Sequence, residues 1–183
     1  GPGLRVKLVA RHGVGYDSVD VAAMSAAGVL VANTPNAVAR PVATMALTLL
    51  LALAHRLPAK DRLARQGRWA ERVEHMGVGL TGRTLGVIGA GRIGKELLRL
   101  ARAFDLELLA ADPYVGAGEL AALGARGVTL EALMAGSDFV VVACPLNEHT
   151  RRLVDGEALA RMRPGAFFIN VARGPVVDER ALY

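Results

Sequence analysis

The sequence LGVIGAGRIGKELLRLARAFDLELLAAD, residues Leu85–Asp112, reads in order as a strand, a glycine turn, a helix, a second strand and an acid. Four apolar or small residues precede Gly89, an amphipathic run follows Gly94, and a second apolar run ends at Asp112. This order is typical of the βαβ unit that binds a dinucleotide. The stretch therefore predicts both a local fold and a ligand.

Each glycine of the GxGxxG pattern has its own role in such a site. Gly89 permits the tight turn after the strand, Gly91 lets the backbone approach a pyrophosphate, and Gly94 lets the helix pack closely on the sheet. The N-terminus of the helix presents free N–H groups and partial positive charge to the phosphates. The alternative interpretation is that these glycines form a plain turn and that no nucleotide binds.

The acid at the end of the second strand indicates which dinucleotide is preferred. Asp112 lies eighteen residues after Gly94, near the spacing of about 20 residues expected for the acid that binds the ribose hydroxyls. Its carboxylate would repel a 2′-phosphate, so the sequence predicts NAD rather than NADP as the cofactor.

Composition excludes several classes of protein. The chain has 183 residues, of which 52% are hydrophobic, and its longest apolar run, Val42–Ala54, has thirteen residues. A bilayer-spanning helix needs about 20, so we expect no membrane partner. The sequence begins with no leader pattern and its single cysteine, Cys144, cannot form an internal disulfide. These features favour a cytoplasmic protein.

The net charge of +5 and the pI of about 10.0 raise the question of nucleic acid binding. The basic residues are spread along the chain, with no run beyond pairs such as Arg151-Arg152 and no interleaved aromatic residues. We therefore expect no nucleic acid partner. The sequence also predicts no metal site.

The rest of the chain alternates strands with helices, which predicts an α/β fold with a Rossmann-type, doubly wound parallel sheet. We place a domain boundary at the turn Asn33–Asn36, giving residues 1–35 as a remnant of a second α/β substrate domain and residues 36–183 as an NAD-binding Rossmann domain, incomplete at its C-terminus. The remnant is predicted as a strand over 4–10, a helix capped by Asp17 or Ser18 and a strand over 29–32.

Two helices and an arm follow the boundary. Residues 37–54 are apolar almost all round, which predicts a helix buried on several sides. Pro58 is placed to begin the next helix, which reaches about Gln66. Trp69 lies just beyond, in the polar segment GRWAERVEHMG. We consider two roles for Trp69, a dimer contact or a cover for its own domain.

Two further strands end in residues that suggest a ligand site. A buried strand over 139–143 ends at Cys144-Pro145, and a strand over 166–170 ends at Val171-Ala172-Arg173. The carboxyl ends of parallel strands lie at one edge of the sheet, where ligands bind. Arg173 is the best candidate for an anion-binding or polarising group, and its alternative role is a surface ion pair. The remaining predicted elements are helices at 119–123, 130–135 and 155–162, a strand at 127–128 and a helix capped by Asp178.

Six segments of the sequence together resemble one protein family, and they occur in the same order as in that family. The D-isomer-specific 2-hydroxyacid dehydrogenases, which include D-3-phosphoglycerate dehydrogenase, glyoxylate reductase and formate dehydrogenase, are similar over RHGVGYDSVD, GVLVANTPNAVA, LTGRTLGVIGAGRIG, AADPY, SDFVVVACPLNEHT and MRPGAFFINVARGPVVDERAL. The resemblance implies an NAD-dependent oxidoreductase that transfers a hydride between the cofactor and C2 of a 2-hydroxy acid or 2-keto acid, and it implies a homodimer.

The resemblance also implies roles for particular residues. Arg173 matches the family's catalytic arginine, which binds the substrate carboxylate and 2-oxygen. The substrate loop would contain Val14 and Gly15. The cofactor would be bound by Gly89, Gly91, Arg92, Ile93, Gly94, Asp112, Cys144, Pro145, Val171 and Ala172.

Proton transfer in the family uses a histidine and a glutamate that lie downstream of the VARG segment. This chain ends ten residues after Arg173, and none of His12, His55, His75 and His149 is at the family's acid–base position. We therefore expect the chain to be inactive alone and its parent to be the enzyme. The substrate stays open between phosphoglycerate-like and glyoxylate-like acids, and the alternative function is a non-enzymatic NAD-sensing or scaffold protein on the same fold.

Overall fold

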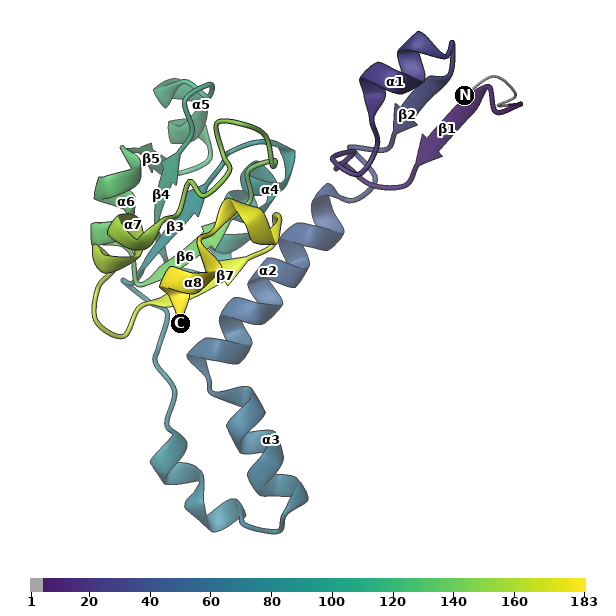
Figure 1. Cartoon of the computed structure of the whole chain (residues 1–183). Helices are drawn as coiled ribbons and strands as arrows, with labels where there is room; N and C mark the ends of the chain where they lie inside the picture. The colour runs from purple at the N-terminus through teal and green to yellow at the C-terminus, as the bar shows by residue number, and fades with distance from the viewer. Residues whose placement is uncertain (1–4) are drawn as a thin grey trace.

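The computed structural model describes residues 5–183, and its larger sheet has five parallel strands (Figure 1). Their order is β5-β4-β3-β6-β7. The chain begins at the centre, moves outward in one direction and then returns to build the other half, so the strand order reverses between β3 and β6. This is the Rossmann arrangement predicted from the sequence. The strands are β3 (Thr84–Ile88), β4 (Glu107–Ala111), β5 (Ala125–Gly127), β6 (Phe139–Val142) and β7 (Phe167–Asn170).

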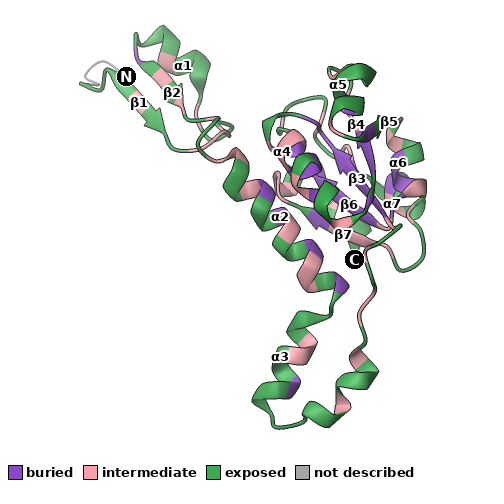
Figure 2. Cartoon of the chain, turned by 180° about the vertical axis from the view of Figure 1, so that it is seen from behind, coloured by how far each residue is buried: buried purple, intermediate pink, exposed green. Residues whose placement is uncertain are grey.

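Helices cover both faces of this sheet, because successive strand residues point to opposite sides. Val87 packs into one core with α2, α4 and α5, while its neighbour Ile88 packs into a second core with α6 and α7. Figure 2 shows the strands of this sheet as the most buried part of the chain. The covering helices are α2 (Ala39–Ala54), α4 (Arg92–Ala101), α5 (Ala117–Ala122), α6 (Leu130–Gly136) and α7 (Gly156–Ala160).

Helix α2 is buried on one side only, so the prediction of burial on several sides is wrong. Its buried residues are mostly small, namely Ala43, Ala46, Leu50 and Ala54, and they pack against α4 and β7. Its larger side chains face outward, with Met45 55% and Leu49 39% exposed. Small residues let α2 approach the sheet domain closely and leave an apolar stripe uncovered.

An arm follows α2, which we define as residues 57–76. It contains α3 (Leu57–Arg65) and the 3₁₀ helix η1 (Trp69–His75). Pro58 lies in the first turn of α3, as predicted. Figure 1 shows the arm projecting away from both sheets. Within residues 5–183, no single helix is long and apolar enough to cross a membrane. Only α2 and α3 taken together, with a bend of 65° between them, reach that length and apolar composition.

The smaller sheet pairs β1 (Leu8–Arg11) with β2 (Leu30–Asn33) in parallel, joined by α1 (Val21–Ala26). The predicted strand and helix types are confirmed here, although Leu4 lies outside the described residues. The predicted cap of α1 is wrong, because Asp20 accepts the capping hydrogen bond from the N–H of Ala23. Asp17, which we expected to cap the helix, contacts another part of the chain. That this unit is the remnant of a substrate domain stays a prediction.

The last elements of the chain lie against the loop after β6, where the N–H of Val154 donates to the carbonyl oxygen of Val176 and the N–H of Asp178 donates to that of Val154. They are the 3₁₀ helix η3 (Gly174–Val176) and α8 (Glu179–Leu182), while a short 3₁₀ helix, η2 (Arg102–Phe104), follows α4. Asp178 caps α8 as predicted. Arg152 also forms an ion pair with Asp178, which ties the loop after β6 to the end of the chain.

Candidate functional site

A cavity of about 460 Å³ lies at the carboxyl ends of β3, β6 and β7, where the loop after β1 meets the larger sheet. This volume is within the range of roughly 300 to 1,000 Å³ that small-molecule sites occupy. The position is the edge at which open α/β sheets bind ligands, beside the reversal of strand order. We call this cavity the cleft, and its lining is Val14, Gly15, Tyr16, Asp17, Gly91, Arg92, Ile93, Ala143, Cys144, Pro145, Leu146, Asn147, Val171, Ala172 and Arg173.

The cleft brings together ten of the residues predicted from the sequence, from four separate segments of the chain. Three other predicted residues lie outside its lining, namely Gly89, Gly94 and Asp112. Among residues 5–183, no histidine lines the cleft. The same part of the chain contains no group of three or more acidic, cysteine or histidine side chains able to hold a metal ion.

The three loop glycines meet different surroundings. Gly89 has φ +91°, and a Cβ there would lie 2.7 Å from the backbone nitrogen of Cys144. A Cβ on Gly94 would lie 2.1 Å from the carbonyl oxygen of Gly89, so both positions exclude a side chain for packing reasons. A Cβ on Gly91 would meet nothing within 4 Å. Packing therefore does not require glycine at position 91. The open space beside Gly91 in the cleft can accommodate a phosphate group.

Helix α4 begins at Arg92 and directs its first turn toward the cleft. Its N-cap, Gly91, has no side chain to accept a hydrogen bond from the first N–H groups. The helix N-terminus thus offers unsatisfied donors beside Arg92 and Ile93. This geometry fits the anionic part of a dinucleotide.

Asp112, directly after β4, accepts a backbone hydrogen bond at each of its two carboxylate oxygens. Its Oδ2 accepts a hydrogen bond from the N–H of Ala90 at 2.7 Å, and its Oδ1 accepts one from the N–H of Tyr114 at 2.8 Å. A carboxylate has about four acceptor positions in all. The fixed carboxylate therefore keeps acceptor capacity for the hydroxyls of a sugar.

Cys144 forms an apolar part of the wall at the end of β6. It is 8% exposed. Burial raises the pKa of its thiol to about 11, and the charge of Asp112 acts in the same direction, against a backbone hydrogen bond that lowers the pKa. The side chain is thus a neutral thiol near pH 7 and lines the site without acting as a nucleophile.

Arg173 lines the cleft from the loop after β7. Its Nε donates to Oδ1 of Asp17 at 3.0 Å, and its Nη1 donates to the carbonyl oxygen of Ala172 at 2.9 Å. Its Nη2 lies beside Gly15, where a Cβ would be 1.6 Å away. The guanidinium thus lies against the backbone of the loop after β1, and only glycine fits at position 15.

Two asparagines shape the loops of the cleft and were missed by the sequence reasoning. Asn170 accepts a hydrogen bond from the N–H of Ala172 and donates one to the carbonyl oxygen of Arg173, each at 2.9 Å. Asn33 donates to the carbonyl oxygen of Val14 at 2.9 Å. Both asparagines are the last residue of a strand. A polar side chain at that position, where ligand loops begin, was a signal in the sequence.

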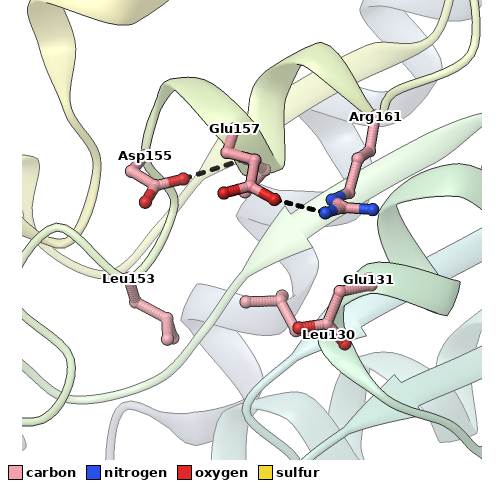
Figure 3. A pocket seen from close by; sticks show the side chains of 7 residues that line it. Leu130, Glu131, Leu153, Asp155, Glu157 and Arg161 are labelled. Atoms are coloured by element: carbon pink, nitrogen blue, oxygen red, sulfur yellow. Dashed lines mark hydrogen bonds and ion pairs between the residues drawn. The ribbon is translucent and has the colours of Figure 1, made fainter.

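A second, smaller cavity of about 170 Å³ lies between α6 and α7 (Figure 3). Three of its four charged residues are engaged locally, since Asp155 caps α7 and Glu157 forms an ion pair with Arg161. None of the predicted site residues lines it, and its volume is below that of typical ligand sites.

The five-stranded parallel sheet, its glycine loop and the cleft at the reversal of strand order define a dinucleotide-binding Rossmann domain. Residues 47–183 match the family described as D-isomer specific 2-hydroxyacid dehydrogenase, NAD binding domain, and the chain belongs to that family. The resemblance stated from the sequence is thereby confirmed.

Relatives of known name agree with this assignment. The chain is 43% identical to the D-3-phosphoglycerate dehydrogenase of Mycobacterium bovis, over 97% of this chain and 34% of that protein. It is 38% identical to the glyoxylate reductase of Thermococcus onnurineus, over 97% of this chain and 55% of that protein. The chain thus spans between about a third and about half of the length of these relatives.

Solved structures show the same fold. The D-lactate dehydrogenase from Aquifex aeolicus, in a structure complexed with NAD and lactic acid, superposes with a TM-score of 0.89 at 30% identity, over 98% of this chain and 54% of that one. The likeness extends over nearly the whole chain, including the smaller sheet.

Proposed function

We propose that this chain is the nucleotide-binding part of an NAD-dependent D-2-hydroxyacid dehydrogenase. One observation carries the proposal: the glycine loop and Arg173 open into the same cleft at the reversal of strand order. A phosphate-binding loop and a cation in one cavity suit a cofactor and an acidic substrate bound side by side.

The cofactor-binding role is assigned to residues whose surroundings fit it. Gly91 and the N-terminus of α4 would hold the pyrophosphate, Asp112 the adenosine ribose, and the apolar wall at Cys144 and Pro145 the adenosine. Val171 and Ala172 would lie toward the nicotinamide end. Bound NAD(H) supplies or accepts the hydride exchanged with C2 of the substrate.

The substrate role is assigned to Arg173, with Val14 and Gly15 on the facing loop. A planar guanidinium can hold a carboxylate through two hydrogen bonds and stabilise negative charge on the neighbouring oxygen. Among the residues that the structure describes, Nη2 of Arg173 donates no hydrogen bond, so this donor is available.

Proton transfer to the substrate oxygen requires a separate acid–base group. The cleft is lined by no histidine within residues 5–183, and we propose that the family's histidine and glutamate belong to the parent protein beyond Arg173. The 183-residue chain should therefore bind NADH weakly and turn over slowly or not at all. Readable steady-state oxidation of a 2-hydroxy acid by the purified chain would contradict this expectation.

Two measurements test the proposed function. Isothermal titration of NADH into the 183-residue chain should give saturable binding, while no heat of binding would leave the glycine loop as a plain turn. NADH oxidation by the full-length protein should then be followed with glyoxylate, hydroxypyruvate, phosphohydroxypyruvate and a branched 2-keto acid. The names of the relatives include both phosphoglycerate and glyoxylate enzymes. The relative rates on this panel therefore identify the preferred substrate.

The second candidate function is a non-enzymatic NAD sensor or scaffold on the same fold. It shares the cofactor site and differs in lacking the acid–base pair. NADH binding without turnover on any acid of the panel, together with a gene that lacks the downstream glutamate and histidine, would favour it. A cytoplasmic location is proposed for either function.

We also propose that the protein is a homodimer and that the uncovered stripe of α2 and the arm form its contact. Trp69 is 49% exposed and Met76 67% exposed. Within the described residues, the one aromatic or cation–π contact of Trp69 is with the guanidinium of Arg72, which lies 5.5 Å from the centre of the ring. The apolar side chains exposed along this surface are Met45, Leu49, Leu53, Leu57, Trp69, Val73 and Met76.

A further inference from the structure

The structure joins two residues that are 156 positions apart in the sequence, Asp17 and Arg173, through one ion pair in the wall of the cleft. Asp17 lies on the loop after β1 and Arg173 on the loop after β7, so the pair connects the smaller sheet to the larger one. Both side chains are about a third exposed, Asp17 at 34% and Arg173 at 38%. Both side chains are therefore partly buried in the wall of the cleft.

The guanidinium is fixed at three places, which is unusual for a long cation at a surface. Asp17 accepts from Nε, the carbonyl oxygen of Ala172 accepts from Nη1, and the backbone of Gly15 limits the space beside Nη2. The loop that carries Arg173 is itself fixed by Asn170. An ordinary exposed ion pair contributes little stability, in the range of about 0 to 1 kcal/mol. The main effect of this ion pair is therefore to fix the position of the guanidinium, and its contribution to stability is small.

Asp17 holds the Nε side of the guanidinium and leaves the Nη2 end for a ligand. A carboxylate ligand can bind guanidinium either along its side, through Nε and one Nη, or end-on through both Nη atoms. With Nε bound to Asp17 and one N–H of Nη1 bound to Ala172, the remaining N–H groups of Nη1 and Nη2 are the donors left to a substrate. Asp17 therefore selects both the rotamer of Arg173 and the edge that it presents.

Other charged groups near the pair do not replace Asp17. A backbone hydrogen bond at Asp17 itself, followed by Arg173, lowers the pKa of the Asp17 carboxyl against a partial burial that raises it, and the charge of Arg11 adds to the lowering. The carboxylate thus stays ionised near neutral pH. Asp20, three residues along, is engaged in capping α1.

We propose that Asp17 is the positioning residue of Arg173, which holds the guanidinium across the cleft with its Nη edge toward the acidic substrate. This role rests on the proposed function and adds a residue from the smaller sheet to the reacting end of the site. Position matters at such a site because a displacement of about 1 Å can cost about 100-fold in rate.

The ion pair itself can be tested on the 183-residue chain by NMR with arginine labelled in ¹⁵N. The Nε–Hε signal of Arg173, identified by its loss in Arg173→Lys, should exchange slowly with water in the wild-type chain and in Asp17→Asn, which keeps an acceptor. The same signal should exchange rapidly in Asp17→Ala. Slow exchange in Asp17→Ala would overturn the proposed contact. Asp20→Ala is the matched control, because it removes a carboxylate from the same loop and should leave the signal protected.

The role can be tested by kinetics on the full-length protein with the best acid of the substrate panel. Asp17→Ala should lower kcat/KM by about 100-fold, Asp17→Asn should recover most of that loss, and the Kd for NADH should stay within about twofold in both. A double-mutant cycle should show that Asp17→Ala has little further effect once Arg173 is alanine.

The outcomes separate the role of Asp17 from the proposed function. Unchanged kcat/KM in Asp17→Ala, or an Asp17→Asn variant as poor as Asp17→Ala, would overturn the positioning role. A parallel loss of NADH affinity and thermal stability would assign Asp17 a structural role instead. An inactive wild-type protein with a protected Nε signal would support the ion pair and count against the dehydrogenase function.

Discussion

Oδ2 of Asp112 lies 2.7 Å from the backbone nitrogen of Ala90 and accepts its hydrogen bond, so the acid that ends β4 is fixed to the glycine loop that ends β3. The carboxylate thus holds the loop in place, and in the proposed function it also supplies acceptors for a ribose. We predict that Asp112→Ser combined with Tyr114→Arg narrows the preference for NADH over NADPH by about tenfold or more, because repulsion of a 2′-phosphate is replaced by attraction. Tyr114 is 88% exposed, so an arginine there costs little packing.

The measurement for this first prediction is the ratio of the two dissociation constants, obtained by titration calorimetry. Tyr114→Arg alone serves as the control for added positive charge. An unchanged ratio in the double variant would mean that the Asp112 carboxylate does not face the cofactor.

Gly91 and Gly94 should respond in opposite ways to the same substitution. Gly94→Ala places a Cβ 2.1 Å from the carbonyl oxygen of Gly89. Crowding of this kind costs about 1–3 kcal/mol or more, which exceeds the gain of up to about 1 kcal/mol in helix propensity. Gly91→Ala meets no atom within 4 Å, so its stability should change by no more than about 1 kcal/mol. Its NADH affinity should nevertheless fall at least tenfold.

Thermal unfolding and NADH titration of the two variants provide the check, and each variant is the control for the other. A stable Gly91→Ala variant that binds NADH as the wild type does would remove the pyrophosphate from this part of the cleft.

The glycine loop was predictable from sequence because its causes are local. The turn at Gly89, the start of α4 and the end of β4 at Asp112 lie within one strand–helix–strand segment, and their periodicity and spacing carry the information. The alternation of strands and helices after residue 83 gave the parallel sheet for the same reason. Boundaries shifted by a few residues, since hydrogen-bond pairing with neighbouring strands decides where each strand ends.

Features that depend on distant segments were not predictable. Asp17 has the residue type and position of a helix cap, and only the fold brings it to Arg173, 156 residues away. Helix α2 is so uniformly apolar that its sequence contains no periodic signal to identify the exposed side. The geometry of its packing on α4 and β7 decides that Ala46 is buried and Met45 is not.

The thiol of Cys144 should react slowly and with an unusual pH dependence. Burial raises its pKa to about 11, so the thiolate that attacks an alkylating reagent is scarce below that pH. The rate with iodoacetamide should rise about tenfold per pH unit from pH 7 to pH 10 without levelling near pH 9. The raised pKa also stabilises the fold below the thiol's unfolded pKa, and this contribution is lost as pH rises toward 11.

The same chain unfolded in guanidinium chloride is the reference for this measurement, and its alkylation rate should level off near the ordinary thiol pKa of about 8.5. Saturating NADH should slow the reaction of the folded chain further. A folded chain that levels off with the unfolded one would place Cys144 in contact with solvent.

The stripe on α2 and the arm should support self-association. Light scattering of the 183-residue chain should give a mass above 19.2 kDa that falls with dilution. Leu49→Asp puts a charge in the middle of the stripe, and it should shift the chain toward the monomer, since burying an unpaired charge is costly. Tyr114→Asp, a similar change at an exposed site outside the stripe, should leave the mass unchanged. Equal masses for the two variants would assign any contact to another surface.

Arg173→Ala in the full-length protein separates substrate binding from cofactor binding. The guanidinium lies in the cleft beside Gly15 and Asp17, while the glycine loop at Gly91 follows another strand, β3. Loss of one donor to a developing oxyanion costs about 100- to 1,000-fold in rate, and in the proposed function Arg173 also binds the substrate carboxylate. We therefore predict a fall of that size or larger in kcat/KM, with the Kd for NADH nearly unchanged.

Arg173→Lys should recover only part of the loss, because an ammonium group cannot form the two parallel hydrogen bonds of a guanidinium. If NADH affinity falls together with kcat/KM in Arg173→Ala, the arginine binds the cofactor, and the acidic substrate must be held by another residue of the cleft, with Arg92 the first to substitute.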